Sequence, residues 1–333
     1  MVIHMEVDIN FITRAYNTFE INKFGIITKI SKDSKLIDEI NYYKQIEKIP
    51  LVSSFFVRHY DTSIGNENKI QLEYINYNNL YEQIIDDNTE YTTLKGISTA
   101  LCEILSTFHK NTPDNIHLYH DSCEKMYKDK TLNEYKKLID SNTYFFKLSL
   151  HKKLNINGIK YNNFESIKFE ILNYITKLLC NNFDITIVHG DFCFGNILAS
   201  HNENKKITSV KLIDPRGSWG VNGIYGDPRY DVAKLYHSFD GKYEYLTNKK
   251  YKLIELNENS FEYQYEQNKN IDIIKDYMIE DIQRLLKYDI REYKLIEGLI
   301  YIGMCARHYD SIDRQKMMYL TGIKLLNEFL ESI

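Results

Sequence analysis

The sequence has few of the residues that mark several classes of protein. It contains five cysteines, and no two of them form a C-x-x-C pair, which argues against a disulfide framework or a zinc knuckle. No apolar run approaches the ~18 residues that span a bilayer, and the apolar stretch 295–306 is interrupted by Glu297. The first ten residues, MVIHMEVDIN, lack the apolar core of a secretory signal. We therefore expect a cytoplasmic protein that makes no membrane contact.

Positive charge is not in excess either. Lys and Arg number 42 against 46 Asp and Glu, which leaves a net charge of −4. Such a chain has no general field with which to attract nucleic acid or anionic lipid. Apolar material is plentiful, since 43% of the residues are hydrophobic, and 333 residues exceed what one core usually serves. We expect a folded protein with two domains or two lobes and no nucleic-acid partner.

The spacing of apolar residues changes near residue 75. Before that point, short alternating segments with turn signals predict strands, among them the strand 25–30 and a hairpin formed by 55–59 and 70–74. An amphipathic helix is expected at 34–46, so a strand that carries Lys29 is followed by a helix that carries Glu39. The domain prediction is a small β-rich lobe, residues 1–75, that includes a hinge strand.

Residues 76–333 are predicted to form a mainly helical lobe, because apolar residues there recur at helical spacing. Two stretches depart from this pattern. Residues 185–214 read as strand, loop, strand, turn and strand, and residues 251–265 alternate as an inserted hairpin does. Helices are expected at about 97–108, 121–140, 164–180, 271–288, 290–307 and 311–331.

The strongest chemical signal is the segment HGDFCFGN at 189–196. An apolar strand delivers Asp191 into a loop, Asn196 follows five residues later, and Asp214 ends a second apolar strand eighteen residues beyond. Phosphoryl transfer needs a carboxylate to orient and deprotonate a hydroxyl, and hard oxygen ligands to hold Mg²⁺ on nucleotide phosphates. The pattern therefore predicts a Mg²⁺-dependent phosphotransferase.

This segment resembles the catalytic core of the aminoglycoside phosphotransferase and choline/ethanolamine kinase group, small-molecule relatives of the protein kinases. The resemblance implies an α+β, protein-kinase-like fold with a small antiparallel β lobe and a larger, mainly helical lobe. It also implies that Asp191 is the catalytic base, that Asn196 and Asp214 are the Mg²⁺ ligands, and that His189 braces the catalytic loop. The stretch DVAKL resembles the helix start that follows in this group, with Asp231 as N-cap and brace.

In the small lobe the resemblance implies the nucleotide contacts. Lys29 would pair with the α- and β-phosphates of ATP, and Glu39 would be its ion-pair partner. The backbone of the hinge strand LEYI would meet adenine, with Glu73 and Ile75 as the contact residues. GTP is the alternative donor.

These small-lobe assignments have rivals. Lys32 and Lys35 lie close to Lys29 in the sequence, and Asp38 lies beside Glu39. The expected first hairpin at 14–19 also has no glycine where a phosphate-covering loop usually has one, so it departs from the pattern of the group.

The segment after Asp214 departs from the pattern too, because Pro215-Arg216-Gly217 follows the aspartate. Residues 218–231 hold three glycines, Pro228 and the only tryptophan, and we interpret them as a shaped loop beside the acceptor site. The candidate acceptor-binding residues are Arg216, Trp219, Tyr225 and Arg229. For the two arginines, structural ion pairs with Asp227 and Asp231 are the alternative. Trp219, Tyr225 and Tyr230 would be the members of an aromatic cage for a quaternary ammonium, although among 28 tyrosines such a cluster is uninformative.

The predicted reaction moves the γ-phosphoryl group of ATP to a hydroxyl of a small molecule. IDPRG and YGDPRYD resemble a bacterial subgroup associated with surface-polysaccharide gene clusters, which implies a sugar or polyol acceptor. Choline, ethanolamine or an aminoglycoside are alternative acceptors. An inactive nucleotide-binding partner protein, with the 251–265 hairpin as an interaction edge, is an alternative of another class.

Overall fold

The computed structural model describes residues 17–333 except 182, 204–205 and 287–288. Residues 14–16 of the expected first hairpin and the end of the helix expected at 271–288 lie outside that range. A four-stranded antiparallel sheet in the order β1-β2-β4-β3 comes first, with α1 (Lys35–Ile46) packed against it. Its strands are β1 (Asn17–Ile21), β2 (Ile26–Ser31), β3 (His59–Ser63) and β4 (Asn68–Glu73).

The hairpin predicted at 55–59 and 70–74 starts later than expected. Pro50 opens the short helix α2 (Pro50–Ser53), and the first strand of the hairpin is β3. Residues 55–57 pair instead with β9 (Ile207–Leu212), because Leu212 N–H donates to the Phe55 carbonyl at 2.7 Å and Leu212 O accepts from Val57 N–H at 3.3 Å. Residues 55–57, which were assigned to the small sheet, therefore connect that sheet to residues 185–214. We call residues 185–214 the catalytic segment, because they carry the expected catalytic residues.

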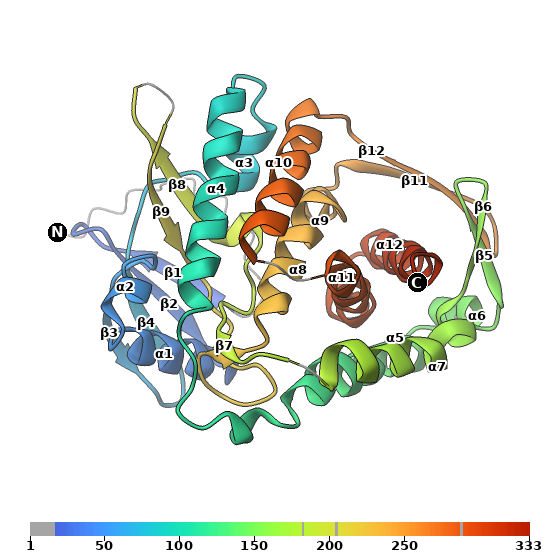
Figure 1. The fold of residues 1–333 in the computed structure, drawn as a ribbon, viewed down its shortest axis with the longest axis horizontal. Coiled ribbons are helices and arrows are strands. Elements are labelled where there is room, and N and C mark those ends of the chain that lie inside the picture. Colours follow the sequence, from blue (N-terminus) through green and yellow to red (C-terminus); the bar gives the residue numbers. More distant parts are fainter. Residues whose placement is uncertain (1–16, 182, 204–205, 287–288) are drawn as a thin grey trace.

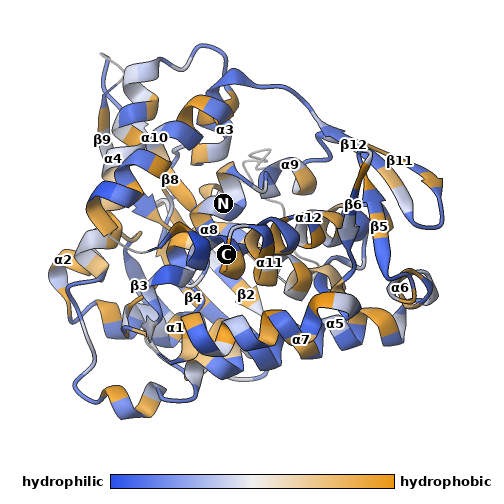
Figure 2. Ribbon diagram, turned by 45° about the vertical axis from the view of Figure 1, so that its right-hand side comes forward, coloured by the Kyte–Doolittle hydropathy of each residue, from blue (hydrophilic) through white to orange (hydrophobic). Residues whose placement is uncertain are grey.

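Helices make up most of the remaining chain, as the spacing predicted (Figure 1). Apolar residues recur at helical spacing between polar ones along α1, α5 and α7, which gives each of these helices a buried face (Figure 2). Among the described residues no helix is both long and apolar enough to cross a bilayer. The helices are α3 (Leu80–Ile85), α4 (Tyr91–Phe108), α5 (Lys130–Ser141), α6 (Thr143–Ser149), α7 (Phe164–Tyr174), α8 (Pro228–Phe239), α9 (Tyr243–Thr247), α10 (Lys269–Leu286), α11 (Ile290–Met304) and α12 (Ile312–Glu331).

Two apolar clusters form the core. The first runs from the small sheet and α1 through the catalytic segment into α4, α8 and α10, and the second lies among α5, α7, α11 and α12. The sheet ends at Glu73 and α3 begins at Leu80, so the secondary structure changes where the boundary at residue 75 was expected. Because one cluster crosses that boundary, the division into 1–75 and 76–333 stays a proposal about lobes and not about independent cores.

The catalytic segment is built from two short antiparallel pairs. β7 (Thr186–Ile187) pairs with β10 (Tyr225–Gly226), and β8 (Ile197–His201) pairs with β9. Residues 189–196 connect β7 to β8, and Asp214 lies two residues after the end of β9. The segment therefore follows the strand and loop order expected from the sequence.

A second four-stranded sheet lies at the far end of the long axis from the small sheet (Figure 1). The expected hairpin is present as β11 (Tyr251–Asn257) and β12 (Ser260–Tyr265). β12 also pairs in parallel with β5 (Lys153–Ile156), which forms an unexpected hairpin with β6 (Ile159–Asn162). The turn between them is Asn157-Gly158, with φ of 52° and 82°. Asn-Gly is a typical hairpin turn, but each flanking strand has only four residues, so the alternating pattern of the strands is short.

Asn163 connects this sheet to the helices around it. Its Nδ2 donates to the carbonyls of Leu148 and His151 at 2.9 and 2.8 Å. Its Oδ1 accepts from the Phe164 N–H at 2.9 Å and from the Tyr319 hydroxyl at 2.6 Å. The side chain is fully buried, so every hydrogen-bonding position of the amide is used inside the protein.

We expect Asn163→Ala to lower the free energy of unfolding by about 3 kcal/mol or more, because it leaves buried carbonyls and a buried hydroxyl without partners. Chemical denaturation measures this change. Asn181→Ala is the matched control, since Asn181 is exposed and its loss should change stability by no more than about 0.5 kcal/mol. Equal effects of the two substitutions would contradict the role given to Asn163.

Candidate active site

The loop that carries Asp191 is held in place by hydrogen bonds to the backbone of its first two residues. The Asp231 carboxylate accepts from the N–H groups of His189 and Gly190 at 2.6 and 2.8 Å. Gly190 has φ +78°, and a Cβ there would lie 2.6 Å from the Cβ of Arg216, so only glycine fits between the loop and Arg216. Asp231 thus braces the loop, as expected.

Asp231 is not the N-cap of α8, in contrast to the expectation from the sequence. α8 begins at Pro228, and Asp227 is its N-cap, with a side-chain oxygen that accepts from the Arg229 N–H at 2.9 Å. Asp231 lies one turn further along and is almost fully buried. Burial raises the pKa of Asp231 to about 7, and the two N–H donors act in the opposite direction.

His189 has the geometry of a brace and not of a proton carrier. Its Nε2 lies 3.0 Å from the carbonyl of Ile213, and its Nδ1 accepts from the Asp191 N–H at 3.2 Å. A carbonyl can only accept, so the ring carries its proton on Nε2. Burial lowers the pKa of His189 to about 4, so the ring is neutral near pH 7. It also stacks on Phe56, with ring centroids 5.8 Å apart.

Asn196 and Lys234 contact Asp191 and fix the position of its carboxylate. Asn196 Nδ2 donates to the backbone oxygen of Asp191 at 2.9 Å and to Oδ2 at 3.1 Å. Lys234 Nζ lies 2.9 Å from Oδ1. The Asp191 side chain remains one-third exposed. The prospective base is therefore held by these contacts and still accessible from the cleft.

Lys234 is a site residue that the sequence analysis missed. It is buried on α8, three residues after Asp231, which places both on one helical face toward the catalytic loop. Burial is the largest single influence and lowers the pKa of Lys234, but the Asp191 carboxylate together with Cys193, Tyr230 and Tyr243 raises it by more. The helical spacing of Asp231 and Lys234 was the available signal.

Lys29 connects the small sheet to the end of β9. Its Nζ lies 2.6 Å from Glu39 Oε2 and 2.8 Å from Asp214 Oδ1. Lys29 is 7% exposed, whereas the side chains of its rivals Lys32 and Lys35 are 80% and 69% exposed. Of the candidate lysines, only Lys29 therefore lies in the cleft.

The pKa values of Lys29 and Glu39 are both shifted in this network. Burial acts against the charge of Lys29, but Asp214 and Glu39 together raise its pKa. Burial raises the pKa of Glu39 to about 7, and the Lys29 ammonium holds it down. Asp38, the rival of Glu39, is half-buried and interacts with Arg216 instead.

Asp214 is held in an unusual backbone conformation. Its φ is +55°, which a residue with a Cβ rarely adopts, and its side chain is half-exposed. The Ile213 N–H donates to the Asn196 carbonyl at 3.1 Å, so the expected metal ligands lie at adjoining ends of β8 and β9. Among the described residues no group of three His, Cys, Asp or Glu side chains is suited to a metal. One carboxylate and one amide oxygen fit Mg²⁺, which takes few protein ligands and completes its shell with phosphates and water.

The hinge residues lie apart from these groups. Glu73 and Ile75 line a cavity of about 780 Å³ between the hinge and α1–α2, and none of the expected catalytic or metal-binding residues lines it. The Glu73 carboxylate accepts from the Arg58 N–H at 3.2 Å, which turns this side chain toward β3. The contact of the hinge backbone with adenine stays a prediction.

The four candidate acceptor residues divide into two pairs. Trp219 and Arg229 are 1% and 2% exposed, so they belong to the interior. Arg216 and Tyr225 are half-buried. Because Trp219 and Tyr230 are buried edge to face, with centroids 6.2 Å apart, they do not form an open cage with Tyr225.

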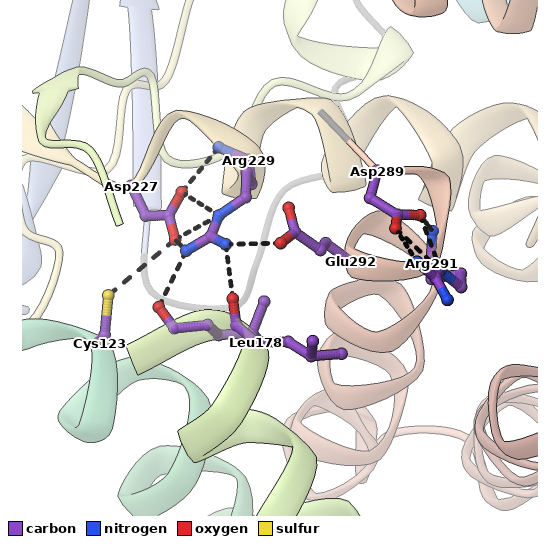
Figure 3. Close-up of polar contacts among 8 residues, drawn as sticks. Cys123, Leu178, Asp227, Arg229, Asp289, Arg291 and Glu292 are labelled. Carbon is purple, nitrogen blue, oxygen red and sulfur yellow. Dashed lines mark hydrogen bonds and ion pairs between the residues drawn. The ribbon is translucent and has the colours of Figure 1, made fainter. Parts of the chain in front are cut away.

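Arg229 forms the ion pair that the sequence left as the alternative. Its guanidinium lies 2.6 Å from Asp227 and 3.3 Å from Glu292, and it donates to the carbonyls of Leu178 and Leu179 (Figure 3). These contacts tie α8 to α11 and to the π-helical segment Ile175–Cys180 that continues α7. Arg229 is therefore occupied in the interior and does not reach the cleft.

Gly217 brings the segment after Asp214 against α1. Its φ is +70°, and a Cβ there would lie 2.1 Å from the carbonyl oxygen of Asp38. This carbonyl is backbone of α1, next to Glu39, so it has little freedom to move. The close approach keeps Glu39 and Asp214 within reach of the same lysine.

We expect Gly217→Ala to lower the free energy of unfolding by about 2 kcal/mol or more, because alanine is strained at this φ and collides with α1. Thermal unfolding measures the change. Gly65→Ala is the control, since a Cβ at Gly65 meets no atom within 4 Å. If Gly217→Ala melted with the Gly65→Ala protein, the close approach to α1 would be unimportant.

Comparisons with known proteins agree with this geometry. Residues 77–216 match the model of the ecdysteroid kinase-like family, a range that contains Asp191, Asn196 and Asp214 but not Lys29 or Glu39. A search of curated proteins found no match.

Solved structures show the fold. The structure of APH(2'')-IIia with GDP and kanamycin has a TM-score of 0.51 at 13% identity, covering 98% of this chain and 95% of that chain. The aminoglycoside phosphotransferase APH(2'')-Ib with ADP gives 0.50 at 14% identity, with 96% and 95% covered. A thermostable mutant of APH(4)-Ia with ADP and hygromycin B gives 0.50 at 12%, with 90% and 85% covered. The predicted resemblance and the predicted protein-kinase-like fold are confirmed.

Proposed function

We propose that the protein is a small-molecule kinase that moves the γ-phosphoryl group of ATP to a hydroxyl of a soluble acceptor. The observation that carries the proposal is the buried ion pair of Lys29 with both Glu39 and Asp214. A nucleotide function explains why a buried lysine, a helix carboxylate and an aspartate with positive φ meet at one place. In kinases this arrangement positions phosphates and metal.

Each group has a part in the proposed reaction. Asp191 accepts the proton of the acceptor hydroxyl, whose oxygen forms the new bond to the γ-phosphorus while the bond from phosphorus to the bridging oxygen of ADP breaks. Lys234 favours the ionised form of Asp191. Lys29 binds the α- and β-phosphates. Asn196 and Asp214 would hold Mg²⁺, which supplies positive charge to the phosphate oxygens.

A sugar or polyol is the acceptor that we favour. The IDPRG and YGDPRYD resemblance supports it. A polycationic aminoglycoside needs an acidic wall, whereas Lys130 and Arg216 lie near Asp191. A choline acceptor needs an aromatic cage, and the expected cage residues Trp219 and Tyr230 are buried. The free cysteines support a reducing, cytoplasmic setting.

The first test measures the melting temperature with Mg²⁺ alone, with MgATP and with MgGTP. A nucleotide at 100 times its Kd should stabilise the protein by about 2.7 kcal/mol, and the nucleotide that does so is the donor. Asp191→Asn should keep this shift and lose about 10²-fold or more in turnover. Asp276→Asn, at an exposed position of α10, is the control with the same change of charge.

Two results would contradict the proposal. If neither nucleotide shifted the melting temperature at millimolar concentration, the cleft would not be a nucleotide site. If both nucleotides bound but wild type and Asp191→Asn were equally inactive with every acceptor, the protein would be a nucleotide-binding partner and not an enzyme.

A second test uses the pH dependence of Glu39. Above pH 7 the carboxylate is charged and grips Lys29, and as the pH falls through about 7 it takes up a proton. We expect Glu39→Gln to raise the KM for MgATP about tenfold at pH 8, since a charge-assisted contact is lost. The difference from wild type should narrow toward pH 6. Glu20→Gln, exposed on β1, should show no such trend, and a pH-independent difference for Glu39→Gln would contradict this role.

A further inference from the structure

Two cations meet at one hydroxyl near the prospective base. Lys130, the first residue of α5, places Nζ 3.3 Å from the Tyr230 hydroxyl. Arg216 places Nη1 3.4 Å from the same oxygen. Tyr230 lies on α8, four residues before Lys234, whose Nζ contacts Asp191. Residues from α5, α8 and the segment after β9 thus bring positive charge together beside the catalytic loop.

This positive charge is poorly balanced. Within the described residues neither Lys130 nor Arg216 forms an ion pair with a carboxylate, although Arg216 interacts at longer range with Asp38 and Lys130 with Asp191. Arg307, which also acts on Lys130, is already paired with Glu134 at 3.2 Å. Burial, Arg216, Arg307 and Lys234 all lower the pKa of Lys130, and Asp191 acts in the opposite direction. Half-buried cations in such a position are stabilised by a bound anion.

We propose that the acceptor carries, besides its reacting hydroxyl, an anionic group that binds between Lys130 and Arg216. A phosphate monoester or a carboxylate has the required chemistry, so the acceptor class is a sugar phosphate, a polyol phosphate or a hydroxy acid. This inference rests on the proposed kinase function, because it takes Asp191 as the site of the reacting hydroxyl.

The spacing of the groups suits a small metabolite. Tyr230 and Lys234 are one helical turn apart, and side chains at that separation have Cβ atoms about 5–6 Å apart. The anion would lie over Tyr230 and the reacting hydroxyl over Asp191, beside Lys234. A distance of this order separates the ends of a three- to six-carbon chain. Both cations are half-buried and the base is one-third exposed, so solvent reaches all three groups.

The experiment compares matched acceptors. Glycerol with glycerol 3-phosphate, glucose with glucose 6-phosphate, and glucose with gluconate are assayed for MgATP-dependent ADP release, and their binding is measured by calorimetry with MgADP present. We expect the charged member of at least one pair to bind at least tenfold more tightly than the neutral one. Phosphate esters and hydroxy acids form separate arms, which distinguish the two sources of negative charge.

Variants assign the effect to the two cations. Lys130→Gln and Arg216→Gln should each lower the affinity for the charged acceptor at least tenfold. Lys136→Gln removes the same charge from an exposed position of α5 and should leave the affinity unchanged. Without any ligand, the melting temperature of Lys130→Gln should be no lower than that of wild type, because the substitution relieves repulsion among cations. A lysine with a purely structural role would give the opposite sign.

Three outcomes would overturn the inference. The first is equal binding of neutral and charged acceptors throughout the panel. The second is a loss of MgATP affinity in Lys130→Gln and Arg216→Gln with anion binding intact, which would assign the cations to the nucleotide. The third is a lower melting temperature of free Lys130→Gln with unaltered anion selectivity. An anion-dependent shift without any nucleotide binding would instead keep the site and reject the proposed kinase.

Discussion

The cleft depends on a lysine whose charge is buried. An ammonium group loses most of its hydration at 7% exposure, so it is tolerated only where carboxylates surround it. Glu39 comes from α1 and Asp214 from the end of β9, which means that neutralising Lys29 holds a helix, a sheet and the catalytic segment in one arrangement. Removing one acid would leave a half-compensated charge, so the three elements are positioned by a common electrostatic requirement.

Backbone pairing and aromatic packing of residues 55–57 support the same arrangement. Residues 55–57 extend the backbone pairing of β9 toward the small sheet, and Phe56 stacks on His189. Because His189 in turn accepts from the Asp191 N–H, the aromatic contact and the position of the prospective base are linked by two steps. The neutral ring suits this task, since a buried charge at His189 would need a partner of its own.

The sequence predicted those parts of the site whose residues lie close together along the chain. Asp191 and Asn196 lie in one short loop, and Asp214 follows after the two short strands β8 and β9, so their order already indicates their placement. Lys29 was separable from Lys32 and Lys35 only by burial, which the short strand pattern left open. Lys130 acts near Asp191 through α5, from a position with no local signal, and no spacing rule predicts such a contact between distant segments.

Two identical tripeptides show why local sequence was insufficient for the arginines. Asp-Pro-Arg occurs at 214–216 and again at 227–229. Asp227 has φ −71°, caps α8 and binds the arginine two residues later, an arrangement that recurs at Asp289 and Arg291 (Figure 3).

Asp214 has φ +55° and gives its carboxylate to Lys29, so Arg216 has no capping aspartate and turns to the Tyr230 hydroxyl instead. The positive φ that directs the Asp214 carboxylate to Lys29 therefore leaves Arg216 to contact Tyr230, on the side where the acceptor would bind. The backbone of Asp214 thereby sets both the carboxylate that would face Mg²⁺ and the charge that an acceptor would meet.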